Sequence, residues 1–322
     1  MEKSITKKNS SRIKKILQEN SALAILIVLI IIGTLLYPVF LTPTNLFNVM
    51  RQSTFNGLIA IGMTFVIITG GIDLSVGSIF AFASVFSSYV QTMPVIVMFL
   101  ITLVLCVLLG FFNGIAVAKL NIAPFIVTLA TMMGYRGICY LLTDGGITQN
   151  ISNNAFISVG RSYILGILPT PSVILLIVLA IAVYILKYTA FGRAVYAVGG
   201  NAEAARMMGL HIQRTKVSVY MINGLLAGLA GMLMAARMAS GEPVTGDGYE
   251  MNAISAVVLG GALLSGGKGS VIQSVIGALV LGVLNNIMNM QGNMSAQIQN
   301  VVMGTLLLVI VIAQTGIHKN DE

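Results

Sequence analysis

One carboxylate stands inside an otherwise apolar stretch of the chain, in the sequence GGIDLSVGS that begins at Gly70. A charged group within a bilayer is unfavourable and usually functional, so Asp73 is a candidate for the path of a polar solute or ion. The same side chain could instead cap the following helix by accepting a hydrogen bond from the backbone amide of Ser75 or Val76. The sequence leaves both roles open, and they are compatible.

A second group of polar side chains consists of amides within apolar runs. Each needs a hydrogen-bond partner away from lipid, so we expect them to face the interior of a helix bundle or a water-filled path. Uncharged amides suit neutral, hydroxyl-rich solutes, although any one of them could simply link two helices. The residues predicted to line a translocation path are Asn56, Asp73, Ser75, Asn113, Asn223, Asn285 and Asn286.

No set of residues predicts catalysis or metal binding. The two histidines are His211 and His318, and neither an H-E-x-x-H nor a G-x-S-x-G sequence occurs. The segment GGALLSGGKGS, residues 260–270, has the composition of a phosphate-binding loop but lacks the G-x-x-x-x-G-K-[ST] spacing, which favours a cytoplasmic turn. We therefore expect no catalytic residue, no metal site and no cofactor bound by this chain.

The composition predicts the elements that must position these residues. Hydrophobic residues make up 57% of the 322 residues and charged residues 9%, which excludes a soluble globular domain and indicates a multi-pass membrane protein. Apolar runs of about 20 residues can cross a bilayer. Ten spans are predicted, near residues 21–41, 53–70, 74–91, 94–118, 122–142, 171–188, 216–237, 250–265, 271–290 and 296–314.

Two stretches qualify this assignment. Gly70 and Gly71 interrupt the apolar pattern, so residues 53–91 could hold a broken or re-entrant helix. The segment TPTNLFNVMRQ, residues 42–52, is expected to lie flat at the outer interface, with Pro43 starting a turn of helix.

The distribution of basic residues predicts the orientation. Placing both termini in the cytoplasm puts most of the 18 Lys and Arg residues on the cytoplasmic side, as the positive-inside rule requires. The predicted organisation is a basic cytoplasmic N-terminus over 1–20, one transmembrane domain over 21–314 with a cytoplasmic loop at 189–215, and a cytoplasmic tail over 315–322. The net charge of +8 reflects this topology, so we expect contact with membrane lipid and no nucleic-acid partner.

Weak internal similarity favours a transporter over a membrane enzyme. NGLIA at residues 56–60 is echoed by NGLLA at 223–227, and scattered identities link the region after residue 110 to the region after residue 282 at a similar offset. Predicted helices two to five and seven to ten would then be repeats of opposite orientation, as in many transporter folds.

The most polar internal segment, residues 191–210, ends in the sequence AVGGNAEAARMMGL and predicts a short helix that stands in water and contacts another protein. The two glycines would allow a tight turn into the helix, Glu203 would complement the helix dipole and pair with Arg206, and Gly209 would end the helix. Its alanine-rich face, formed by Ala202, Ala204 and Ala205, would allow close docking on a partner. The residues assigned to this loop are Gly192, Arg193, Gly199, Gly200, Asn201, Glu203, Ala204, Ala205, Arg206 and Gly209.

Three segments together resemble one family: GMTFVIITGGIDLSVGSIFAF, the polar loop over residues 192–210, and YEMNAISAVVLGGALLSGGKGSVI. This family is the permease subunit of bacterial ATP-binding-cassette (ABC) importers for monosaccharides, the ribose-permease type within the branched-chain amino acid and sugar permease family. The resemblance covers about residues 21–314. It implies an all-α fold like that of type II importers, in the bacterial cytoplasmic (inner) membrane, with the 189–215 loop holding the coupling helix.

The resemblance also implies partners. These are a second permease subunit, either an identical copy or a close paralogue, two ABC ATPase subunits that bind ATP and Mg, and an extracytoplasmic sugar-binding protein. The segment NNIMNMQGNMSAQIQNVVMG is Met- and Gln-rich where ribose permeases usually carry aromatic residues, which leaves the identity of the sugar open. A nucleoside or branched-chain amino acid permease and an ion-coupled secondary transporter are the alternatives.

Overall fold

The structure is a computed structural model that describes residues 21–164, 166–292, 294–295, 297–299, 301–305 and 308. The predicted cytoplasmic segments 1–20 and 315–322 and much of the predicted span 296–314 lie outside these residues. The helices are α2 (Ser21–Leu36), α3 (Pro43–Ile68), α4 (Val76–Tyr89), α5 (Val95–Ala118), α6 (Pro124–Leu142), α7 (Asn154–Arg161), α8 (Thr170–Tyr188), α9 (Ala190–Gly200), α10 (Ala202–Met207), α11 (Ile212–Met238), α12 (Tyr249–Leu259) and α13 (Val271–Met290).

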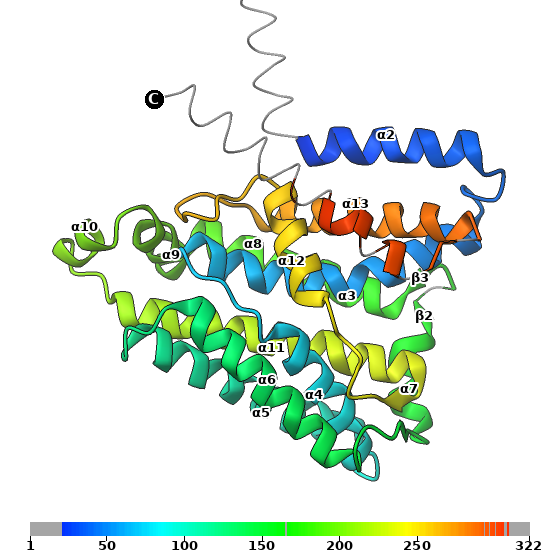
Figure 1. Cartoon of the computed structure of the whole chain (residues 1–322), viewed down its shortest axis with the longest axis horizontal. Helices are drawn as coiled ribbons and strands as arrows, with labels where there is room; N and C mark the ends of the chain where they lie inside the picture. The colour runs from blue at the N-terminus through cyan, green and yellow to red at the C-terminus, as the bar shows by residue number, and fades with distance from the viewer. Residues whose placement is uncertain are drawn as a thin grey trace, which may run out of the picture.

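Two short antiparallel strand pairs join loops between the helices. Strand β1 (Gln149–Asn150) pairs with β4 (Ser240–Gly241), and β2 (Tyr163–Ile164) pairs with β3 (Leu168–Pro169). Most of the long helices run along the long axis of the molecule (Figure 1). One end of that axis, which we call the α10 end, carries α9 and α10, and the other, the α7 end, carries α7, β2 and β3.

Five of the described helices are long and apolar enough to cross a membrane: α5, α6, α8, α11 and α13. Of the most apolar window of α11, 72% is buried, against 22% for α5 and for α6, so α11 lies in the core while α5 and α6 present apolar surface. Glycines allow α11 to pack closely on α5, because a Cβ on Gly110 would overlap the backbone of Tyr220 and one on Gly224 would overlap Cys106. Close approach of backbones through small residues is how helices associate in lipid.

Two helices are too short to span and meet end to end inside the bundle. Helix α4 has 14 residues and α12 has 11, about 21 and 17 Å at a rise of 1.5 Å per residue. Their N-termini lie together, since a Cβ on Gly246 would stand 2.6 Å from the carbonyl O of Gly77 and the rings of Phe80 and Tyr249 are 4.8 Å apart. The broken helix considered for residues 53–91 is confirmed.

Two expectations about this architecture are wrong. The predicted span 250–265 ends as a helix at Leu259, because glycines with positive φ at 261, 266 and 267 turn the chain into the loop that leads to α13. Pro43 starts a helix as predicted, but residues 42–52 do not form a separate interfacial segment, because that helix, α3, continues to Ile68 without interruption. Proline suits that position, since the first helical amide has no partner within the helix.

Candidate functional site

The Asp73 carboxylate is fully buried at the break between α3 and α4. Its Oδ1 accepts hydrogen bonds from the backbone N of Ser75 at 2.9 Å and from the Ser75 hydroxyl at 2.6 Å. Its Oδ2 accepts one from Nδ2 of Asn223, on α11, at 2.9 Å. The predicted bond to the amide of Ser75 is therefore confirmed, and the carboxylate also joins this break to the central helix.

The network continues into α5 and α6. Nδ2 of Asn113 donates to the Ser75 hydroxyl at 2.7 Å, and the Tyr135 hydroxyl donates to the carbonyl O of Leu109 at 3.0 Å, with Oδ1 of Asn113 3.4 Å away. Asp73, Ser75, Asn113 and Asn223 are each fully buried. Ser75 and Asn223 donate to the carboxylate and Asn113 donates to Ser75, so this Asp73 network ties α5 and α11 to the segment 69–75 that precedes α4.

The structure brings together four of the seven predicted path residues and places the other three elsewhere. Asn56 is buried on α3, and its Oδ1 has no hydrogen-bond partner among the described residues. Asn286 exchanges two hydrogen bonds with the amide of Asn45, at 2.8 and 3.1 Å, which links α13 to the start of α3. Asn285 is half-buried on α13. Their role in a solute path stays a prediction.

The loop predicted to dock on another protein consists of two helices. Thr189 caps α9 by accepting a hydrogen bond from the backbone N of Gly192, and Asn201 caps α10 by accepting one from Ala204. Gly209, at φ +79°, ends α10 as predicted, and Glu203 lies in the first turn. At the tip, Met207 and Met208 are 90% and 69% exposed.

Three details of this loop differ from the expectation. Gly199 and Gly200 are the last residues of α9 rather than a turn before the helix. Ala205 is fully buried, so it packs inside the chain and leaves Ala204 as the exposed alanine. No ion pair joins Glu203 to Arg206, since the Arg136–Asp247 pair is the one salt bridge within the part of the chain that the structure describes.

A junction of glycine backbones connects this loop to the α3–α4 break. We call it the glycine junction and define it by Ile68, Gly70, Gly199, Gly266 and Gly267. The backbone N of Gly267 donates to the carbonyl O of Ile68 at 2.9 Å, and a Cβ on Gly199 would overlap that same carbonyl. A Cβ on Gly266 would stand 2.9 Å from the carbonyl O of Gly199 and 3.0 Å from the N of Gly70. Three chain segments therefore meet with no side chain between them.

Tyr196 fastens α9 to the same place. Its hydroxyl donates to the carbonyl O of Gly269 at 2.8 Å, and burial raises the pKa of that hydroxyl, so it stays protonated and able to donate. Sequence reasoning missed Tyr196 and the role of the glycines at 266 and 267. The signal available was that three Gly-Gly pairs, at 70, 199 and 266, fall next to predicted cytoplasmic ends.

Three arginines gather at the α7 end, which sequence reasoning also did not single out. The Arg51 guanidinium lies over the ring of Tyr163 at 5.0 Å, and its Nε and one Nη atom are buried without a hydrogen-bond partner among the described residues. Arg161 donates from Nε to the carbonyl O of Arg237 at 2.7 Å. Within the described ranges, no carboxylate forms a salt bridge with Arg51, Arg161 or Arg237. We call these three residues the arginine cluster.

Several permease proteins are similar in sequence to nearly the whole chain. The family described as "Branched-chain amino acid transport system / permease component" matches residues 45–311. The chain is 42% identical over 307 residues to the ribose import permease protein of Haemophilus influenzae, which covers 94% of each. It is 44% identical over 296 residues to that of Bacillus subtilis, 89% of each. The L-arabinose transport system permease protein of Escherichia coli is 38% identical over 313 residues, 95% of this chain and 93% of that protein. No solved structure matches.

The Asp73 network predicts a loss of stability on a minimal change of side chain. Asp73→Asn removes one acceptor oxygen and introduces an amide that faces donors, so at least one buried hydrogen bond is lost. We expect unfolding in detergent at a lower temperature, from a loss of about 1–3 kcal/mol. Asp144→Asn, in an exposed turn at φ +48°, is the matched control. Equal thermal unfolding of the two variants would contradict the role of the network.

Proposed function

Because the chain belongs to the branched-chain amino acid transport system permease family, we propose that it is the transmembrane permease subunit of an ABC importer and forms the translocation path for a monosaccharide. The family expected from the three sequence segments is confirmed, and the chain is an integral membrane permease rather than a catalytic subunit. The observation that carries the proposal is end-to-end similarity to import permeases named for ribose, at 42% and 44% identity.

Ribose or a closely related sugar is the proposed cargo. Permeases named for ribose and for L-arabinose are both similar over most of the chain, which supports an uncharged sugar over a nucleoside or a branched-chain amino acid. The scarcity of carboxylates argues against ion coupling. Asp73 is held by three hydrogen bonds and so is not a free proton or sodium ligand. An ion-coupled secondary transporter is correspondingly disfavoured.

We propose that the α10 end is cytoplasmic, with both termini on that side and ten membrane crossings, two of which combine a short helix, α4 or α12, with the non-helical segment next to it. The inverted repeat is supported by a shared arrangement: α3 and α11, of 26 and 27 residues, each precede a short helix, α4 or α12, and the N-termini of those two short helices meet. The sequence echo between residues 56–60 and 223–227 falls on the two long helices.

The exposed tip of α10 is the proposed docking site for a partner ATPase, which binds ATP and Mg. Glu203, Arg206, Met207 and Met208 are exposed there, a mixed surface of charge and apolar area on a capped, short helix. The glycine junction gives the docked ATPase a mechanical route into the membrane. Since backbone meets backbone at that junction, movement of α9 must move Ile68 and the segment that carries Asp73.

The arginine cluster is the proposed contact for an extracytoplasmic sugar-binding protein. It lies at the opposite end from α10, and guanidinium groups without a carboxylate partner favour an acidic surface on another protein. A second permease subunit, an identical copy or a paralogue, would complete the path, and the predicted path residues would line or brace it.

Reconstitution tests the proposal directly. The chain is placed in lipid nanodiscs with its genomically adjacent ATPase and binding protein, and ATP hydrolysis is measured with ribose, other sugars, nucleosides and branched-chain amino acids. Stimulation by ribose or a related sugar is expected. Uptake by this chain alone, driven by an ion gradient and without the ATPase, would overturn the proposal.

Reversing the charge at the tip of α10 is expected to weaken coupling. Glu203→Lys should lower sugar uptake by about tenfold, the factor that corresponds to about 1.4 kcal/mol of docking free energy, while the amount of protein in the membrane stays unchanged. Thr92→Lys adds a positive charge to an exposed loop at the other end and serves as the control. Normal uptake by Glu203→Lys would remove α10 from the docking surface.

Two adjacent glycines provide a matched test of the junction. Gly199→Ala forces a methyl group onto the carbonyl O of Ile68, whereas Gly200→Ala meets nothing within 4 Å. We expect the first variant to lose sugar stimulation of ATP hydrolysis and the second to retain it, at equal membrane levels. If both variants are stimulated equally, the junction does not transmit movement.

Removing one positive charge from the arginine cluster is expected to weaken docking of the binding protein. Arg161→Gln should raise the dissociation constant for the liganded binding protein by about tenfold, and the dissociation constant should change less with salt concentration. Arg214→Gln, exposed at the α10 end, is the control. Identical affinities for the two variants, measured by surface plasmon resonance on nanodiscs, would place the docking site elsewhere.

A further inference from the structure

The N-terminal half of α12 and the loop before it present a polar face on the outside of the described bundle. The Asp247 side chain is 67% exposed, and the side chains of Met251 and Asn252 are exposed and half-exposed. No hydrogen bond joins the Asn252 side chain to another described residue, and the hydroxyl of Ser255 bonds only to the backbone of Met251, at 2.7 Å. We call Asp247, Gly248, Met251, Asn252 and Ser255 the α12 face.

The depth of this face follows from the length of α4. That helix has 14 residues and ends at Tyr89, so its N-terminus lies about 21 Å from its outer end. The α12 face begins beside that N-terminus, because Gly246 and Gly77 are in backbone contact. A hydrocarbon core is about 30 Å thick, so the α12 face lies within the membrane-spanning region.

Lipid cannot cover such a face. An ion pair with an exposed carboxylate, Asp247 with Arg136, and an amide without a partner are both unfavourable against acyl chains, and polar groups at membrane depth face protein or water. The exposed side chains of α5 are apolar by contrast, with Leu100 and Phe112 61% and 62% exposed. The α12 face therefore borders protein or water, whereas α5 borders lipid.

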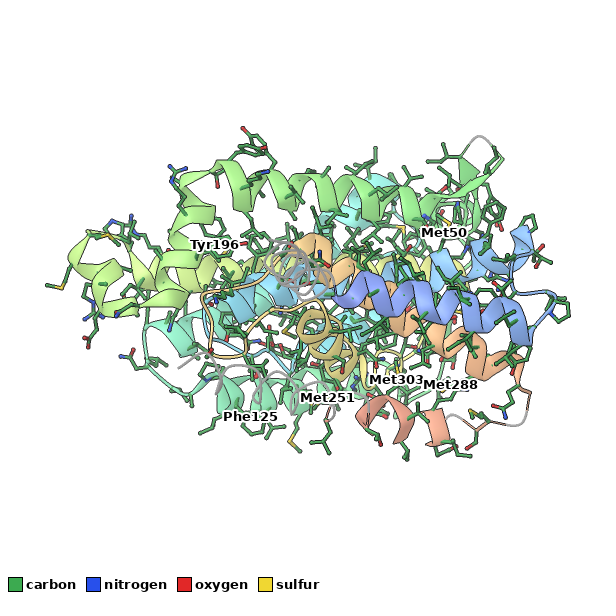
Figure 2. The ribbon with its side chains drawn as sticks, turned by 90° about the horizontal axis from the view of Figure 1, so that it is seen from above. Met50, Phe125, Tyr196, Met251, Met288 and Met303 are labelled. Carbon is green, nitrogen blue, oxygen red and sulfur yellow. The ribbon has the colours of Figure 1, made fainter. Side chains whose placement is uncertain are left out.

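A cavity of about 370 Å³ lies on this face. It is lined by the α12 face together with Met303 and Gly304, and Figure 2 shows Met251 and Met303 on the same side of the molecule. Its size is within the range of roughly 300–1,000 Å³ found for small-molecule sites. The salt bridge of 2.6 Å between Arg136 and Asp247 holds one rim of the cavity in place.

We propose that the α12 face is the wall of the solute path and a binding site for a neutral monosaccharide. Asn252 offers both donors and an acceptor to hydroxyl groups, the hydroxyl oxygen of Ser255 offers an acceptor, and the thioethers of Met251 and Met303 pack against the C–H face of a sugar ring. The Asp247 carboxylate, already neutralised by Arg136, adds an acceptor without net charge. This inference rests on the proposed function and names the site within it.

Cysteine accessibility tests the wall. The experiment measures how fast a cysteine reacts with a water-soluble reagent, in the complex with the ATPase and binding protein in nanodiscs. Two variants on the α12 face, Met251→Cys and Asn252→Cys, are compared with two on α5, Leu100→Cys and Phe112→Cys. The two native cysteines, Cys106 and Cys139, are fully buried and give a low background. The α12 variants should react with the water-soluble reagent 2-sulfonatoethyl methanethiosulfonate at least tenfold faster than the α5 variants. Equal rates would overturn the proposal.

The same preparation tests the ligand. Saturating ribose with the binding protein should slow modification of Asn252→Cys severalfold, and Asn252→Leu should lower sugar uptake at least tenfold with unchanged thermal unfolding. An Asn252→Leu variant with normal uptake would remove the sugar site. If the wild-type complex hydrolyses ATP without any response to sugars, the proposed function fails. If it responds to sugars but the cysteine of Asn252→Cys does not react with the reagent, only the α12 site fails.

Discussion

The Asp73 carboxylate must be buried with all its acceptors occupied, and the centre of the molecule is arranged around that constraint. The segment that carries it re-enters the bundle between α3 and α4, and the donors come from the next turn of chain and from α11. Asn113 extends the same set to α5. Loss of any one donor leaves a buried polar group unpaired, so a single buried side chain constrains how α11 and the segment 69–75 pack together.

The segment that carries Asp73 begins at the glycine junction, which connects the α10 end physically to the centre of the molecule. Backbone contacts join the end of α9 to Ile68, and Ile68 is five residues from Asp73. The segment that carries Asp73 leads directly into α4, whose N-terminus lies beside that of α12, where the polar α12 face begins. A displacement of α10 by an ATPase thus has a short, rigid route to the wall of the proposed path.

Hydropathy predicted most of the helices, because apolar runs and helix ends coincide wherever a span is continuous, as in α5, α8 and α13. It failed at α12, where apolar residues such as Leu263 continue past glycines that end the helix. Pattern alone could name Asp73 and Asn223 as unusual but could not pair them, since they are distant in sequence. The buried side of α10 was also beyond prediction, because Ala205 and Ala204 differ only in what packs on them.

Hydrogen–deuterium exchange of the reconstituted complex tests the connection between α10 and the Asp73 network most directly. The account predicts that trapping the ATPase with ATP changes amide exchange at residues 199–200, 266–269 and 69–75 together, and that Gly199→Ala abolishes the change at 69–75 while α10 still responds. A change confined to α9 and α10 in the unsubstituted protein, with residues 69–75 unaffected, would contradict it.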